Sequence, residues 1–142
     1  GTRGLRAMTM PTNCDAVRIE PDASLTHNVQ PLLHEIRHAL AQLVESGSTS
    51  SIDLRSIPLA PGEEERIEAI LGEGEVRAEL QTLGPSLVQE TSYPGVWLVT
   101  HRNPDGAVIA RFIEVTRIPD ILMSQPEDIE RGISKLESEL QE

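Results

Sequence analysis

Apolar residues recur at helical spacing near the start of the chain. Between residues 26 and 46 they follow one stripe, at Val29, Leu32, Leu33, Ile36, Leu40, Leu43 and Val44. A stripe with a period of about 3.6 residues predicts an amphipathic helix over 26–46 with one buried face. Thr26 or Asn28 is expected to cap this helix, Pro31 falls in its first turn, and Gly47 is expected to end it.

A short strand and a second helix are predicted next. Residues 52–54 form a short, mainly apolar run that is typical of a strand, and Pro58 and Pro61 prevent its continuation. Pro61 suits the first turn of a helix over 62–71, and the three acidic residues 63–65 would lie at the positive end of that helix. Gly72 is expected to end it.

Residues 75–117 have the pattern of strands. Val76, Ala78 and Leu80 alternate with polar residues, and further runs cover 86–91, 96–102 and 107–117. Residues 103–106 read Asn-Pro-Asp-Gly, in which Pro presets φ and Gly tolerates a positive φ. This turn predicts an antiparallel hairpin between the last two runs.

A final helix is predicted over 125–140. Ser124 and Glu127 have the spacing of a capping box. We expect a buried stripe made of Ile129, Ile133, Leu136 and Leu140. The order is therefore α-β-α-β-β-β-β-α, which favours an α+β fold with helices packed on one face of a mostly antiparallel sheet. Residues 1–24 lack periodicity and are expected to form a flexible arm before a single domain at 25–142.

Charge and composition narrow the classes of function. The net charge is −11 and aromatic residues make up 2% of the chain, which argues against binding to nucleic acid. No apolar run approaches the length of a membrane span. The single cysteine excludes an internal disulfide framework, and a reducing, cytoplasmic location is the simplest expectation.

The sharpest motif for chemistry is His-Glu-Ile-Arg-His at residues 34–38. It matches H-E-x-x-H, in which two histidines one helical turn apart bind zinc and the glutamate activates water. On a helical wheel, however, His34 and His38 lie opposite the apolar stripe. A catalytic zinc ion also needs a third protein ligand, for which the remote acids 63–65 and His101 are the candidates.

The histidine pair has four interpretations. His34 and His38 with Glu35 could form a small zinc-dependent hydrolase site. They could instead bind a metal or cluster in transit, or contact a partner protein. A solvated helix face is the simplest interpretation, because the pair points away from the predicted core.

Two further residues are candidates for partner binding. Trp97 stands in a sheet with few aromatic residues, so it either fills the core or serves as a recognition anchor. His101 ends a predicted strand just before the hairpin turn, where a structural role is favoured. No catalytic residue is assigned, and no cofactor is expected.

The chain as a whole resembles the HupH/HyaF family of hydrogenase expression proteins. The resemblance rests on ordered blocks that begin with Leu-His-Glu-Ile-Arg-His-Ala-Leu and continue to the final helix, at 33–40, 52–59, 61–65, 72–76, 95–101, 112–116 and 125–129. It covers most of residues 30–135. Several dispersed blocks in order are far more specific than a five-residue zinc motif.

The resemblance implies an accessory, chaperone-like protein for the maturation of nickel–iron uptake hydrogenase. It implies binding to an immature subunit, the iron–sulfur small-subunit precursor, and to other maturation factors, without enzymatic activity. Many members of the family are longer, and contain this module as their C-terminal region. Because the family has no agreed catalytic residues, none is transferred to this chain. We therefore expect partner contacts at His34, His38, Trp97 and His101.

Overall fold

The structure is a computed structural model that describes residues 28–81 and 84–141. The helices are α1 (Val29–Ser46), α2 (Glu63–Leu71) and α3 (Pro126–Leu140), with short 3-10 turns η1 (Leu54–Ser56) and η2 (Asp120–Leu122). The strands are β2 (Ser50–Asp53), β3 (Arg77–Gln81), β4 (Pro85–Glu90), β5 (Val96–Arg102) and β6 (Val108–Val115). This order confirms the predicted α+β fold, while the predicted arm at 1–24 lies outside the described residues.

The five strands form one antiparallel sheet in the order β2-β6-β5-β4-β3. The hairpin between β5 and β6 is the one that the turn sequence predicts. Its turn is closed by a hydrogen bond from the Gly106 amide to the Asn103 carbonyl, at 2.9 Å. Gly106 has φ 91°, a left-handed conformation that glycine adopts without the strain of a Cβ.

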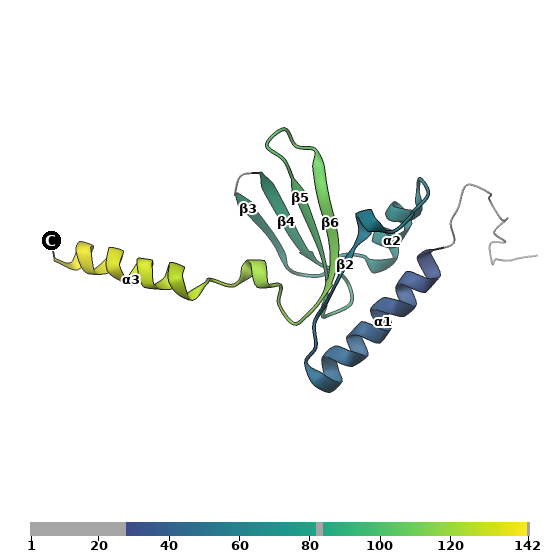
Figure 1. The fold of residues 1–142 in the computed structure, drawn as a ribbon, viewed down its shortest axis with the longest axis horizontal. Coiled ribbons are helices and arrows are strands. Elements are labelled where there is room, and N and C mark those ends of the chain that lie inside the picture. Colours follow the sequence, from purple (N-terminus) through teal and green to yellow (C-terminus); the bar gives the residue numbers. More distant parts are fainter. Residues whose placement is uncertain (1–27, 82–83, 142) are drawn as a thin grey trace, which may run out of the picture.

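Helices α1 and α2 cover one face of the sheet (Figure 1). Their buried side chains interlock with alternate residues of the central strands in the main core. It contains Val29, Leu32, Ile36 and Ala39 from α1, Ile67 and Leu71 from α2, and Ile52, Val96, Leu98, Ile113 and Val115 from the sheet. Val44, which the helical stripe includes, is 85% exposed, whereas Leu40 and Leu43 of the same stripe pack against the main core.

A smaller cluster lies on the opposite face of the sheet. It consists of Val88, Trp97 and Val99, with Ala78, Leu80, Phe112 and Leu122 packed against them. Leu122 comes from η2, so the segment after β6 turns back over this face. The register pairs Val88 with Val99 and Val99 with Phe112, which brings these three side chains to the same face.

The ends of the helices differ in part from the prediction. Asn28 is the N-cap residue of α1, but its side chain does not cap the helix and instead donates a hydrogen bond to the Pro58 carbonyl at 2.8 Å; Thr26, the other predicted cap, lies outside the described residues. Gly47 ends α1 as expected, with its amide bonded to the Leu43 carbonyl. The predicted capping box of α3 is wrong, since Gln125 is the N-cap residue and no side chain caps the helix.

The largest correction concerns the packing of α3. Its four apolar residues were expected to be buried, yet Ile129, Ile133, Leu136 and Leu140 are 53%, 51%, 64% and 82% exposed. Figure 1 shows α3 extending away from the sheet. Helical periodicity identifies an apolar face, but it does not identify what covers that face.

Among the described residues, the helices are too short or too polar to cross a membrane.

Candidate functional site

The His34–His38 pair lies on the exposed side of α1, as the helical wheel predicts. Both imidazoles and the Glu35 side chain are exposed, while Ile36 between them is buried in the main core. Within residues 28–81 and 84–141, no group of three histidine, cysteine or acidic side chains is placed to hold a metal ion. The structure therefore does not assemble a zinc hydrolase site from the residues it describes.

The proposed third ligand His101 lies on the other side of the sheet from α1. His101 shares its face with Trp97 and Val99, since alternate residues of β5 point the same way, whereas α1 packs against Val96 and Leu98. Two of the three first-turn acids of α2, Glu63 and Glu64, make hydrogen bonds to the Ala60 amide and to Arg111. The predicted partner contacts of His34 and His38 stay predictions.

Trp97 is a core residue of the second face. It is 5% exposed, and its indole Nε1 donates a hydrogen bond to the Thr116 carbonyl at 3.0 Å. A buried indole usually satisfies its N–H in this way. This placement fits the core-filling interpretation, and it leaves the side chain little surface with which to contact a partner.

His101 is half-buried and bonded across the sheet. Its Nδ1 lies 2.8 Å from the Ser86 hydroxyl, and its ring meets Phe112 edge-on with centroids 6.0 Å apart. A serine–histidine contact is the starting geometry of an activated nucleophile. Ser86, however, is 6% exposed, and the contact joins neighbouring strands β4 and β5.

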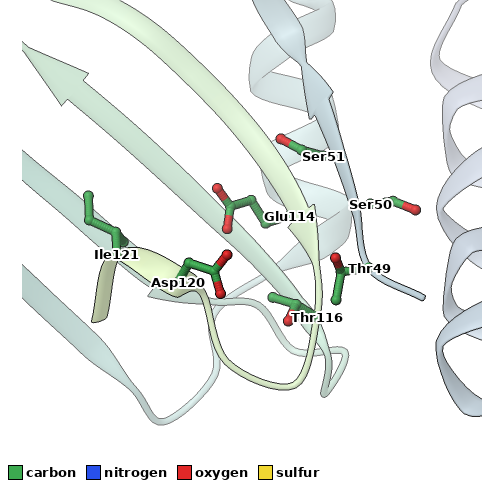
Figure 2. Close-up of a pocket in the computed structure, with 7 residues that line it drawn as sticks. All are labelled: Thr49, Ser50, Ser51, Glu114, Thr116, Asp120 and Ile121. Atoms are coloured by element: carbon green, nitrogen blue, oxygen red, sulfur yellow. The ribbon is translucent and has the colours of Figure 1, made fainter. Parts of the chain in front are cut away.

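A polar hollow of about 290 Å³ lies where β2 meets the end of β6. Figure 2 shows the Glu114 and Asp120 carboxylates beside it, with Thr49 and Ser51 on the same side of the strand and the Ser50 hydroxyl pointing away. The lining residues are Thr49, Ser50, Ser51, Glu114, Thr116, Asp120 and Ile121. Burial raises the pKa of Glu114, the nearby Asp120 carboxylate raises it further, and His101 acts in the opposite direction. The hollow presents acceptors and is suited to N–H donors or basic side chains of a partner.

A partly buried cation joins α2 to the sheet beside the main core. The Arg111 guanidinium on β6 donates to the Glu64 and Glu68 carboxylates of α2 and, at 3.3 Å, to the Thr100 hydroxyl. Burial by itself lowers the pKa of Arg111, but the bonds to Glu68 and Glu64 outweigh it and raise the pKa above its usual value. Glu64, in the first turn of α2, therefore has a structural role in addition to its favourable position at the helix start.

The segment after β6 has the character of a contact surface. Most exposed large hydrophobic side chains of the described residues follow this strand, namely Ile118, Ile121, Met123, Ile129, Ile133, Leu136 and Leu140. Ile121 lines the polar hollow, and Ile118 and Met123 line a neighbouring one of about 550 Å³. Sequence reasoning identified the apolar residues of α3 but assigned them to the core. It missed the hollow and the Ser86–His101 pair, because both depend on strand register.

These features define a small α+β module with an acidic, hydroxyl-lined hollow and an exposed apolar C-terminal segment. The chain belongs to the HupH hydrogenase expression protein family. Residues 26–142 match the model of the family's C-terminal conserved region.

Curated relatives and a solved structure agree with this assignment. The chain is 29% identical over 118 residues to the hydrogenase expression/formation protein HoxQ of Azotobacter vinelandii, covering 82% of this chain and 41% of that protein. It is 28% identical over 114 residues to HupH of Rhodobacter capsulatus, covering 80% and 41%. The chain thus spans about two-fifths of the length of these relatives.

The similarity extends to three dimensions. A solved structure of the hydrogenase expression protein HupH from Thiobacillus denitrificans superposes with a TM-score of 0.79 at 41% identity. The match covers 82% of this chain and 98% of that one. The fold described here is therefore the fold of the family's C-terminal region.

Proposed function

We propose that this chain is a non-enzymatic accessory module in the maturation of nickel–iron hydrogenase, and that it binds an immature subunit of the enzyme. Its relatives are hydrogenase expression and formation proteins, which supports the link to hydrogenase. The observation that carries the binding role is the concentration of exposed apolar side chains after β6. Surfaces of this kind mark sites of contact between proteins.

The iron–sulfur small-subunit precursor is the subunit we propose as the partner. A module of this kind would cover apolar surface of the precursor until assembly with other maturation factors. The acidic hollow beside Glu114 and Asp120 supports a partner that supplies hydrogen-bond donors or positive charge. His34 and His38 extend one exposed face of α1 and remain candidates for a second contact.

The test is an affinity pull-down of the tagged chain from cells that express the hydrogenase, read by mass spectrometry. The proposal predicts enrichment of the small-subunit precursor over the mature subunit. Two variants locate the contact, His34→Ala/His38→Ala on α1 and Ile133→Ser/Leu136→Ser on α3. Absence of enrichment, with abundant precursor in the input, contradicts the proposal.

A further inference from the structure

The apolar residues of α3 have the spacing of a coiled-coil seam. Ile129, Ile133, Leu136 and Leu140 follow one another at intervals of four, three and four residues, and we call them the C-terminal seam. This alternation is the d-a-d-a pattern of a heptad, in which apolar side chains insert between those of a facing helix. Each member is at least half exposed, and α3 contributes no buried residue to the module.

Acidic residues flank the seam. In the heptad register, Glu130 and Glu137 occupy the e positions on one side, and Gly132 and Glu139 occupy the g positions on the other. These positions form ion pairs across a helix–helix interface and set the choice of partner. A partner with acidic flanks would be repelled, and one with basic flanks would be attracted.

The two basic residues of α3 lie away from the seam. Arg131 and Lys135 occupy positions f and c on the back of the helix, and Arg131 pairs there with Asp128. Lys135 stands one helical turn before Glu139 and can offset that flank, but neither cation stands one turn from Glu130 or Glu137. The charge pattern of α3 is therefore one of an apolar centre, acidic edges and a mixed back.

This pattern disfavours a second copy of the chain as the occupant. In an antiparallel pair of α3 helices, Glu130 and Glu137 would face the same residues of the other copy. In a parallel pair Gly132 would face Glu137, which supplies no ion pair. The net charge of −11 adds repulsion between whole molecules.

We propose that the C-terminal seam docks onto an amphipathic helix of the immature hydrogenase subunit whose apolar stripe is flanked by lysine or arginine. The identity of this partner rests on the proposed function, whereas the chemistry of its helix follows from the seam and its flanks. The seam supplies apolar burial, and the glutamates select the partner by charge. This is the helix-against-helix mode of recognition.

Two synthetic peptides test the chemistry on the full chain. Both are 21-residue helices with Ile and Leu at a and d, one with Lys and the other with Glu at e and g. The Lys peptide is expected to bind at least about tenfold more tightly. The reversed variant Glu130→Lys/Glu137→Lys/Glu139→Lys is expected to exchange this preference. Equal binding of both peptides, or binding of neither, overturns the proposal.

The seam variant Ile133→Ser/Leu136→Ser tests the apolar part. It is expected to weaken binding of the Lys peptide by about tenfold or more, because two apolar contacts are lost. The matched control Ser134→Ala/Ser138→Ala changes the back of α3 and is expected to bind as the parent does. Circular dichroism confirms that each variant remains folded, which the absence of buried residues in α3 predicts.

Sedimentation of the chain without peptide tests the alternative occupants. The proposal predicts that α3 does not mediate self-association at neutral pH. A dimer that the seam variant dissociates, or a seam protected from hydrogen exchange in the unbound monomer, overturns it.

Binding of the small-subunit precursor then separates the two hypotheses. If the precursor binds the seam variant as well as the parent chain, the seam proposal fails and the proposed function stands. If the Lys peptide binds but the precursor does not, the proposed function fails, and with it the assignment of the seam to this subunit.

Discussion

At the scale of single residues, Arg111 connects α2 to the sheet. Its side chain is 14% exposed, and the two carboxylates that it contacts, Glu64 and Glu68, are 30% and 39% exposed. A charge-assisted hydrogen bond between partly buried groups contributes more to the free energy of unfolding than an ion pair on the open surface does. The exposed Arg77–Glu79 pair, at 3.8 Å, provides the comparison.

We predict that Arg111→Met lowers the free energy of unfolding by about 1–3 kcal/mol, because two carboxylates lose their cation. Arg77→Met is the matched control and should change it by about 0.5 kcal/mol or less. Urea denaturation of both variants measures the difference. Similar effects for the two variants would contradict the role assigned to Arg111.

The raised pKa of Glu114 predicts that its contribution to folding stability changes with pH in the opposite direction to that of an ion-paired carboxylate. Its pKa is raised in the folded state by burial first and by Asp120 second. The folded chain therefore binds more protons than the unfolded chain between the unfolded value, near 4.5, and the raised value. In this window the contribution of Glu114 to stability increases as the pH falls, and its charged form destabilises the fold above the window.

We therefore expect Glu114→Gln to be more stable than the parent chain at pH 7, and the difference to shrink as the pH approaches 4.5. Denaturation curves at several pH values measure it. The exposed residue Glu35 provides the control variant Glu35→Gln. If the stability advantage of Glu114→Gln over the parent chain instead grew as the pH fell, the pKa of Glu114 would be lowered in the folded state.

At the scale of secondary-structure elements, α2 begins without a hydroxyl cap. The Glu63 carboxylate accepts a hydrogen bond from the Ala60 amide at 2.8 Å, and the residue is 4% exposed. This contact performs the part of a capping box in which a glutamate side chain reaches back to the preceding turn. Gly62, at φ 93°, gives the chain the turn that this arrangement needs.

Glu63→Ala is expected to destabilise the module by about 1–3 kcal/mol, since the buried Ala60 amide loses its acceptor. Glu65→Ala removes an exposed acid from the same helical turn and should have a clearly smaller effect. Thermal or chemical unfolding distinguishes them. Equal losses would mean that the charge of the first turn, and not the bond to Ala60, stabilises α2.

Helix α3 is expected to be less stable than α1. It has 15 residues and no buried side chain, and an isolated helix of this length is only marginally stable in water. We predict that the amides of α3 exchange with deuterium faster than those of α1, and that Gly132→Ala slows them by raising helix propensity. A Cβ at Gly132 would meet open space, so this substitution adds no clash. Hydrogen-exchange mass spectrometry provides the measurement, and α3 exchange as slow as that of α1 would contradict it.

The elements themselves could be predicted from local patterns, and their environments could not. The stripe of α1 and the turn at 103–106 specify their structures within a few residues, so the helix and the hairpin follow from sequence. The seam of α3 has equally clear periodicity, but the same pattern fits a buried face and an unpartnered one. The Ser86–His101 bond and the polar hollow depend on which residues of distant strands are neighbours.

At the scale of the whole molecule, charge and apolar surface indicate the same kind of partner. The net charge is −11, the hollow beside β2 contains two carboxylates, and glutamates flank the exposed seam. Attraction of this kind speeds association and is screened by salt. The motif at 34–38, which first suggested zinc chemistry, lies on a separate exposed face.

The most direct test of the central claim is a binding titration between the purified chain and the purified small-subunit precursor, with the mature hydrogenase as the control. The account predicts saturable binding of the precursor, weaker at high salt, and much weaker binding of the mature enzyme. Equal binding of precursor and mature enzyme, or no binding of the precursor at low salt, would contradict the claim that this module binds an immature subunit.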